Sequence, residues 1–321
     1  MPSQTGVDQS HLKPAPDFVI IGAPKCGTTS LYATLQLHPE VFLSPIKEPH
    51  YFAFDYPRRR EVESLHDYDR LFSKAKDNQL RGEVSVYYLS SAEAVPAILA
   101  RRPDAKFIAL VRNPVDLFVS FHNELLKGFD EDRQSLEGAW RMQEQRARGI
   151  GVPKHCIVPT TLQYKYICSL GQQLERVFRL VPEAQRLVLL YEHLRQDPKD
   201  TIEKITTFLG ISSNRSDVMF ESNTFGRYNN AFTPKLMRAG IENPTIRRLR
   251  AKLKPFLSEC GIRRPMSWLM QLSLESTPKP ILSDAFREEL ADAFSVDVRL
   301  LEQLLSRDLS HWRISETSRS I

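Results

Sequence analysis

Short apolar runs alternate with amphipathic stretches along the first 211 residues of the chain. The runs that predict buried strands are DFVIIGA (17–23), RGEVSVYYL (81–89), AKFIALV (105–111) and QRLVLLYEHL (185–194). The stretches with helical spacing of apolar positions are TTSLYATLQLH (28–38), SAEAVPAILARR (91–102), NPVDLFVSFHNELLKG (113–128) and DPKDTIEKITTFLGI (197–211). Strands that alternate with helices indicate a mostly parallel sheet covered on both faces.

Residues at the ends of the predicted helices support these assignments. Pro114 stands just inside the start of one helix and Gly128 at its end. Ser90 or Ser91 opens another helix, and Gly210 closes the last of them. The pattern therefore predicts an α/β fold of the P-loop type with three layers, in which helices flank a central, mostly parallel sheet.

The last third of the chain has a different pattern, because strand signals fade from about Ser212. SNTFGRYNNAFTPK (222–235) predicts a loop, and residues 235–275 predict basic helices. Residues 283–305 predict an amphipathic helix pair with Ser283 as its N-cap. We expect these C-terminal helices to pack on the sheet.

The same pattern predicts how the chain is divided. Residues 17–312 form one domain, which includes the basic helical region. The polar, proline-rich residues 1–16 form a disordered lead, and residues 313–321 form a short tail.

Composition narrows the class of protein. The chain has 321 residues, 41% of them hydrophobic, which is enough for a sizeable core. No apolar run reaches about 18 residues, so we expect no transmembrane segment. The N-terminus lacks the apolar stretch of a signal peptide, and the four widely spaced cysteines show no metal-ligand spacing. These features favour a cytoplasmic protein without a bound metal.

The net charge of +5 is concentrated in residues 235–264, which hold nine Lys and Arg against two Glu. One interpretation is a solvated helix face, and the other is a docking surface for an acidic substrate, a membrane or nucleic acid. No nucleic-acid-binding signature accompanies the charge, so we expect no specific nucleic acid partner.

The stretch IGAPKCGTTSL (21–31) follows the first predicted strand and leads into a helix, which is the context of a phosphate-binding loop. Gly22 and Gly27 have the spacing of a Walker A loop, but Thr28 stands where that loop has its lysine, and the lysine is Lys25. Backbone N–H groups and a helix N-terminus bind phosphate without that lysine. The first predicted anion site consists of Lys25, Cys26, Gly27, Thr28, Thr29 and Ser30.

A second anion site is predicted where the strand FIALV ends. Arg112 stands where a nucleotide triphosphatase would have a metal-binding aspartate, and Ser120 follows about two helical turns later. Both predicted anion sites lie at the carboxyl ends of strands, where open α/β sheets bind ligands. A nucleotide with phosphates at both ends of its ribose fits this arrangement.

The two stretches APKCGTTSL (23–31) and LVRNPVDLFVSFHN (110–123) resemble the nucleotide signatures of sulfotransferases that use 3′-phosphoadenosine-5′-phosphosulfate (PAPS). The chain is most similar to the bacterial and heparan-sulfate-type branch of that family. The further stretches that carry the resemblance are LHPEVFLSPIKEPHYF (37–52), GEVSVYYLSS (82–91), LVLLYEHLRQDP (187–198), FLGI (208–211) and SRDLSHW (306–312).

The resemblance implies an enzyme that moves a sulfuryl group from PAPS to a hydroxyl or amine, with the 3′,5′-bisphosphate PAP as product and no metal. It implies that Lys25 and the residues from Gly27 to Ser30 bind the 5′-phosphate, and that Arg112 and Ser120 bind the 3′-phosphate. Arg227 and Asn230 match the segment that closes over the nucleotide in that family.

The resemblance also assigns catalytic roles, to Lys25 on the donor side and to Glu48 and His50 on the acceptor side. Two residues apart in an extended segment, Glu48 and His50 would point to one side. We expect Glu48 to be the general base, with its pKa raised by burial and lowered by Lys25 beside it. Glu83 is either a residue of the sheet or a site residue.

The sequence departs from the family at two positions, since Val84 replaces a lysine and Ala53 an aspartate. The acceptor therefore stays open among a carbohydrate, a lipid and a small molecule. Two other functions also remain open, an atypical P-loop kinase or nucleotide-binding protein, and a non-catalytic protein that binds anions through residues 235–264.

Overall fold

The computed structural model describes residues 14, 16–212, 226–228, 274–276 and 278–313. The basic region 235–264 and nearly all of the predicted lead and tail lie outside these residues. The chain divides into two compact units, the first made of residues 1–118, 163–221 and 284–321 and the second of residues 119–162 and 222–283. The single domain predicted over residues 17–312 stays a prediction.

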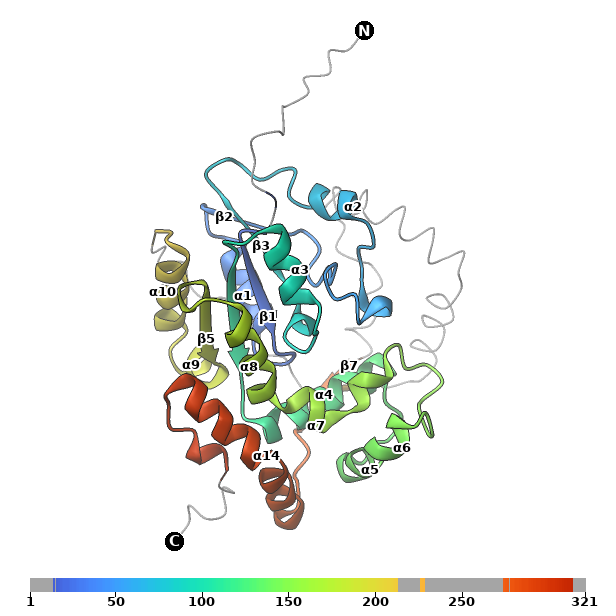
Figure 1. Ribbon diagram of the computed structural model, residues 1–321. Coiled ribbons are helices and arrows are strands. Elements are labelled where there is room, and N and C mark those ends of the chain that lie inside the picture. Colours follow the sequence, from blue (N-terminus) through green and yellow to red (C-terminus); the bar gives the residue numbers. More distant parts are fainter. Residues whose placement is uncertain (1–13, 15, 213–225, 229–273, 277, 314–321) are drawn as a thin grey trace. The chain divides into compact units, whose positions relative to one another are not determined.

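A five-stranded parallel sheet forms the centre of the first unit (Figure 1). Its strands are β1 (Phe18–Gly22), β2 (Val41–Leu43), β3 (Leu80–Val84), β4 (Lys106–Val111) and β5 (Arg186–Leu190), in the order β2-β3-β1-β4-β5. All five residues of β1 are buried, as its continuous apolar run predicts. The predicted parallel sheet is confirmed.

Helices cover both faces of this sheet. The chain leaves β1 toward β2 through α1 (Thr28–Leu35) and leaves β3 toward β4, in the other direction, through α3 (Ala94–Arg101). Right-handed crossovers in opposite directions place α1 and α3 on opposite faces, as Figure 1 shows. The strand order therefore reverses beside β1, and ligands of open α/β sheets bind at such a point.

Further helices complete the first unit. They are η2 (Pro57–Arg59), α2 (Leu65–Arg70), η3 (Val86–Tyr88), α7 (Tyr164–Cys168), α8 (Leu170–Leu180), η5 (Glu183–Gln185), α9 (Tyr191–Gln196), α10 (Pro198–Leu209), α14 (Asp284–Leu305) and η6 (Ser310–Trp312). Gly210 closes α10 with a φ of 78°, as predicted. No helix among the described residues is long and apolar enough to cross a membrane.

Five predictions about elements were wrong. The strand predicted over residues 185–194 ends at Leu190 and continues as α9. Residues 41–43 form β2, which the sequence analysis missed because three residues between prolines carry too short a pattern. The predicted strand 81–89 ends at Val84 and turns into η3. Residues 283–305 form one continuous helix, α14, in place of a pair. In the last third, residues 226–228 and 274–276 pair as antiparallel strands β6 (Gly226–Tyr228) and β7 (Leu274–Ser276), where a loop and a helix were expected.

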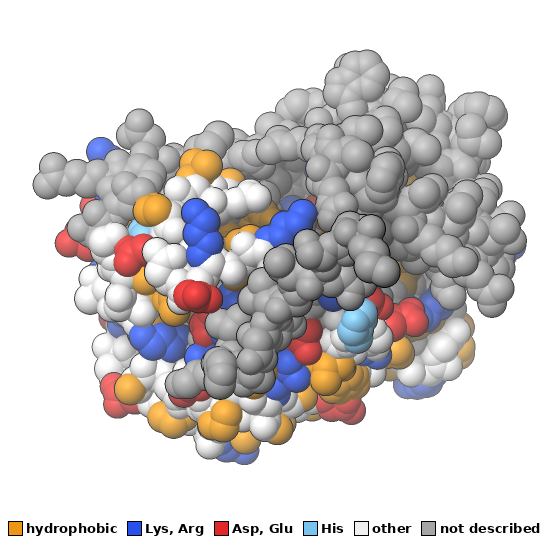
Figure 2. Space-filling view, turned by 90° about the horizontal axis from the view of Figure 1, so that it is seen from above, with side chains coloured by type: hydrophobic (Ala, Val, Ile, Leu, Met, Phe, Trp, Pro, Cys, Tyr) orange, Lys and Arg blue, Asp and Glu red, His pale blue; other side chains and the backbone are white. Residues whose placement is uncertain are grey.

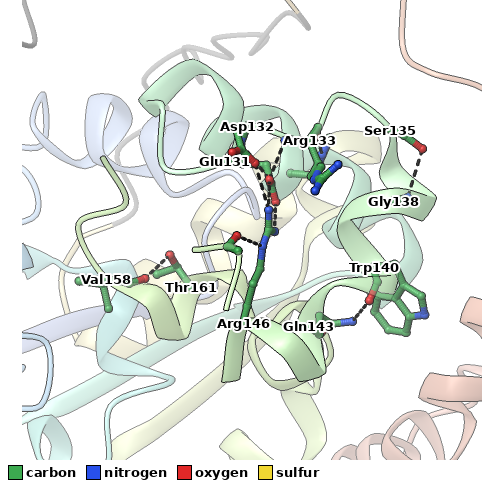
Figure 3. Close-up of polar contacts among 12 residues, drawn as sticks. Glu131, Asp132, Arg133, Ser135, Gly138, Trp140, Gln143, Arg146, Val158 and Thr161 are labelled. Carbon is green, nitrogen blue, oxygen red and sulfur yellow. Dashed lines mark hydrogen bonds and ion pairs between the residues drawn. The ribbon is translucent and has the colours of Figure 1, made fainter. Parts of the chain in front are cut away.

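The second unit contains most of α4 (Pro114–Gly128) together with α5 (Leu136–Arg141), α6 (Gln143–Ala147) and η4 (Pro159–Leu162). Figure 3 shows its central polar contact, in which the Arg146 side chain points at Glu131 and Asp132. Arg146 Nη1 lies 2.5 Å from Glu131 Oε2 and Nη2 lies 2.6 Å from Oε1, and both side chains are fully buried. This paired contact holds the segment after α4 against α6.

Charged side chains of both signs are interspersed over the described surface in the view of Figure 2. The described part of the chain therefore presents no single-sign patch on that face. The predicted basic surface belongs to residues 235–264, which the structure does not describe.

Candidate active site

The loop between β1 and α1 is tightly folded. Gly27, just before the first residue of α1, has a φ of 85°, which suits glycine. A Cβ atom on Gly27 would lie 2.7 Å from Leu194 Cδ2 and 3.1 Å from Tyr191 Cδ2, both on α9. Glycine is therefore required where the loop passes α9. The loop leads directly into the first turn of α1, whose N–H groups form the kind of site that binds phosphate.

The side chains of the loop divide into buried and accessible groups. Cys26 is fully buried and donates to the Pro24 carbonyl at 3.5 Å, and burial raises the pKa of its thiol to about 12. Its thiol is therefore no nucleophile at neutral pH, and Cys26 offers a ligand only its backbone. Thr28 and Ser30 are also buried, whereas Lys25 and Thr29 are half-buried.

Arg112 lies beside the loop. It follows β4, which pairs with β1, and its Nη1 donates to the Lys25 carbonyl at 3.0 Å. Its guanidinium also stacks on the Tyr191 ring, 4.7 Å from the centroid. The structure therefore brings the Arg112 guanidinium to the backbone of the loop that carries Lys25.

The other predicted nucleotide residues lie elsewhere or outside the description. Ser120 is buried in α4, among the residues of the second unit, so its pairing with Arg112 stays a prediction. Arg227 lies in β6, where its backbone is opposite Glu275, and nothing is described of its side chain. Asn230 lies outside the described residues.

Glu48 and His50 lie close together. His50 Nε2 is 3.6 Å from Glu48 Oε2. The extended segment that we expected was wrong. Glu48 has a φ of 63° and His50 one of 49°, so both residues have a left-handed backbone conformation. Lys25, with a φ of 63°, shares this left-handed conformation. Non-glycine residues in that conformation cost free energy and cluster at functional sites, which supports all three as site residues.

The charge state of Glu48 follows from its neighbours. Burial raises its pKa, but the interaction with His50 and the positive charge of Lys47 outweigh burial and lower the pKa to about 2. Lys47 Nζ lies 2.7 Å from Glu48 Oε1. The expectation that Lys25 lowers the pKa of Glu48 was wrong, because the lysine in contact with Glu48 is its chain neighbour Lys47. The sequence analysis missed Lys47, although its place next to Glu48 was a usable signal.

Glu83 is a buried residue of β3. Its side chain is fully buried, and Oε2 accepts a hydrogen bond from the Tyr68 hydroxyl, whereas Oε1 has no hydrogen-bond partner. Burial raises the pKa of Glu83 to about 6, although the hydroxyls of Tyr68, Ser85 and Tyr88 lower it. Glu83 is therefore a buried residue of β3 whose role as a site residue stays a prediction, and its tyrosine neighbours were not predicted.

Arg59 and Arg60, which follow the segment of Glu48 and His50 in the chain, lie over aromatic rings. Arg59 lies over the Tyr87 ring at 5.3 Å, and Arg60 over the rings of Tyr51 and Phe54 at 5.1 and 4.8 Å. Tyr87 in turn contacts His50, with ring centroids 5.1 Å apart. An aromatic cluster with two guanidinium groups therefore adjoins the Glu48–His50 pair.

Comparisons with known proteins bear on the fold and the family of the chain. A crystal structure of a sulfotransferase from Alicyclobacillus acidocaldarius superposes with a TM-score of 0.67, at 24% identity, over 94% of this chain and 99% of that one. At that identity the likeness shows the fold alone. Human heparan sulfate glucosamine 3-O-sulfotransferase 6 is 30% identical over 65% of this chain and 56% of its own length.

Human carbohydrate sulfotransferase 15 is 28% identical over 63% of this chain and 45% of its own length. The chain thus spans about half the length of the curated relatives it matches. The family model of the sulfotransferase domain matches residues 15–238, more than half of the chain. The chain therefore belongs to the sulfotransferase domain family.

Proposed function

We propose that the protein is a PAPS-dependent sulfotransferase that acts on a hydroxyl or amine of a carbohydrate, lipid or small molecule. The observation that carries the proposal is the contact between Arg112 and the Lys25 carbonyl, at the ends of two adjacent strands. It brings the Arg112 guanidinium to the backbone of the loop that leads into α1, which supports a ligand with phosphate groups at this edge of the sheet. The curated relatives named above support the reaction class.

The loop residues fit the donor. The backbone from Gly27 to Ser30 and the Lys25 ammonium would hold the 5′-phosphate, and the Arg112 guanidinium would hold the 3′-phosphate. PAPS, when bound, supplies an activated sulfuryl group. Sulfuryl transfer resembles phosphoryl transfer in that the protein contributes positioning and charge stabilisation. Lys25 neutralises the charge that develops on the 5′-phosphate side.

On the acceptor side, we assign to Glu48 the role of the general base that takes the proton from the attacking hydroxyl or amine. About a third of its side chain is exposed, whereas the His50 side chain is only 4% exposed, so Glu48 is the group that an acceptor reaches. A pKa of about 2 makes Glu48 a weak base as long as Lys47 and His50 hold it. An acceptor hydroxyl that displaces Lys47 from Oε1 would remove one of these restraints. His50 then orients the carboxylate through Oε2.

The compartment is part of the same proposal. Cys26 and Cys168 are both buried thiols outside any disulfide. Free thiols favour a reducing environment, which supports action in the cytoplasm.

A thermal-shift experiment tests the nucleotide assignment. PAP should raise the melting temperature, because a ligand that binds only the folded state stabilises it by mass action, and Mg-ATP should do so weakly. Equal or stronger protection by Mg-ATP would favour the kinase alternative. Binding that survives Lys25→Ala and Arg112→Ala would favour an anion-binding protein.

Arg112→Ala separates the two phosphates. It should weaken binding of PAP by about 1.5–3 kcal/mol, the contribution of a hydrogen bond to a charged group, and leave binding of the 3′-dephosphorylated analogue nearly unchanged. Isothermal titration calorimetry with both nucleotides measures this difference. Equal weakening of the two would make Arg112 structural and remove the 3′ assignment.

A further inference from the structure

Three alternate backbone N–H groups hold the catalytic segment (residues 48–53) against the supporting segment (residues 83–88). The hydrogen bonds run from Glu48 N to Val84 O at 2.9 Å, from His50 N to Ser85 Oγ at 3.2 Å and from Phe52 N to Tyr88 OH at 3.0 Å. Only the first acceptor is a carbonyl. The other two are side-chain hydroxyls, whose hydrogen-bonding direction depends on what else they touch.

The catalytic segment needs such support. Glu48 and His50 both have left-handed φ angles, and each such residue costs roughly 1–3 kcal/mol unless its surroundings impose it. The two hydroxyl acceptors contribute to that support directly below His50 and Phe52. Whatever fixes the direction of these hydroxyls therefore also fixes the positions of the Glu48 and His50 side chains.

Both hydroxyls lie near Glu83. Its carboxyl group accepts a hydrogen bond from Tyr68, and the nearby hydroxyls of Ser85 and Tyr88 lower its pKa without forming a hydrogen bond to Oε1. An ionised carboxylate only accepts hydrogen bonds, so it draws both hydroxyl protons toward itself and leaves the hydroxyl lone pairs for the N–H groups of His50 and Phe52. A protonated carboxyl group competes as a donor and removes this constraint.

We propose that Glu83 is a positioning residue, which sets the catalytic segment through the hydroxyls of Ser85 and Tyr88 and does so only when ionised. Its role in sulfuryl transfer rests on the function proposed above, whereas its hold on the segment does not. The titratable groups that face it are Tyr68 of α2 and Tyr88 of η3. Tyr88 also contacts the ring of His50 in the catalytic segment, and Arg101 of α3 acts on Tyr68. At the register of Glu83, β1 contributes only the apolar Val19.

Hydrogen–deuterium exchange on the full, ligand-free chain tests this hold. After correction for intrinsic rates, Glu83→Gln should speed exchange of the catalytic segment by about tenfold at neutral pH, the effect of losing one hydrogen bond's net contribution. In the wild type the same acceleration should appear on going from about pH 7.5 to about pH 5, because Glu83 takes up its proton in between. The strand β5 should exchange unchanged in both comparisons and serves as the internal control.

Tyr68→Phe is the matched variant, since it leaves Glu83 and its charge in place. The variant should keep the protection of the catalytic segment at neutral pH. This protection should be lost at a higher pH than in the wild type, because removing the Tyr68 donor raises the pKa of Glu83. The comparison within the wild type does not depend on any variant folding. Equal, pH-independent protection of residues 48–53 in all three proteins would overturn the proposal. The function proposed above fails separately, through the absence of stabilisation by PAP.

Discussion

Two fully buried carboxylates, Glu83 in the first unit and Glu131 in the second, have opposite kinds of partner. Glu131 receives two hydrogen bonds from the Arg146 guanidinium and two more from the N–H groups of Asp132 and Arg133. Glu83 receives hydroxyl donors only, and one of its oxygens has no hydrogen-bond partner. Among the described residues, no cation pairs with Glu83.

The difference shows that burial alone does not define the role of a carboxylate. A guanidinium compensates the charge of Glu131, so that side chain serves as a fixed structural contact. Glu83 lacks such compensation, and its pKa of about 6 lies close to neutral pH. Perturbed pKa values without a structural ion pair favour functional sites. Four carboxylates with different partners make this comparison testable.

The largest effect is expected at the compensated pair. Arg146→Ala leaves Glu131 buried without its cation and should lower the free energy of unfolding by about 3–5 kcal/mol, as for other broken buried pairs. Urea denaturation at neutral pH measures it. The double variant Arg146→Leu/Glu131→Leu should recover much of the loss, because it removes both charges. A loss below about 1 kcal/mol in Arg146→Ala would remove the contrast with Glu83.

The next effect concerns the pH dependence of stability. The folded state raises the pKa of Glu83 from 4.5 to about 6, so it binds the proton more tightly than the unfolded state does. The resulting stability is fully present below about pH 4.5 and is lost as the pH rises through about 6, a loss of about 2 kcal/mol. Urea denaturation across this range should show the slope in the wild type and not in Glu83→Gln.

This slope sharpens the inference about the catalytic segment. Global stability should increase at acidic pH while the protection of residues 48–53 decreases. A change in general packing would move both in one direction. Identical slopes in the wild type and Glu83→Gln would show that Glu83 does not titrate between pH 4.5 and 6.

The sequence predicts the nucleotide side of the candidate site better than the surroundings of Glu83 and Glu48. The loop after β1 and Arg112 after β4 were predicted because short apolar strands fix where their carboxyl ends lie. The partners of Glu83 were not, because Tyr68 lies 15 residues before it and no periodicity links the two. Lys47 is the direct neighbour of Glu48, which was a usable signal, but the local backbone of Glu48 is left-handed, a conformation that non-glycine residues rarely adopt and that no pattern predicts.

Local pattern also fails where a contact closes over a long sequence distance. Asp297, in the middle of α14, accepts hydrogen bonds from Gly171 N at 2.8 Å and from Gln172 N at 2.9 Å. It acts as an N-cap for α8 from a separate helix, which explains why a polar residue occupies a buried position of an amphipathic helix.

Asp297 represents a third kind of buried carboxylate, one held by backbone amides. Asp297→Ala should lower the free energy of unfolding by about 1–2 kcal/mol, the usual cost of a lost cap, and Asp297→Asn should cost less because it keeps an acceptor. Urea denaturation of both variants gives the comparison. If Ala and Asn cost the same, the carbonyl-type acceptor is not what stabilises the start of α8.

The smallest effect on stability is expected at Lys47, since about a quarter of its side chain and a third of that of Glu48 are exposed. Lys47→Met should change the free energy of unfolding by less than about 1 kcal/mol, as for other solvent-exposed pairs. Its effect on Glu48 should nevertheless be clear, because removing the cation raises the pKa of Glu48 from its value of about 2. Carboxyl-carbon NMR titration follows this pKa, and Lys47→Arg, which keeps the charge, should leave it low. An unchanged pKa in Lys47→Met would mean that His50 alone holds the Glu48 carboxylate, and that an acceptor need not displace Lys47 for Glu48 to accept a proton.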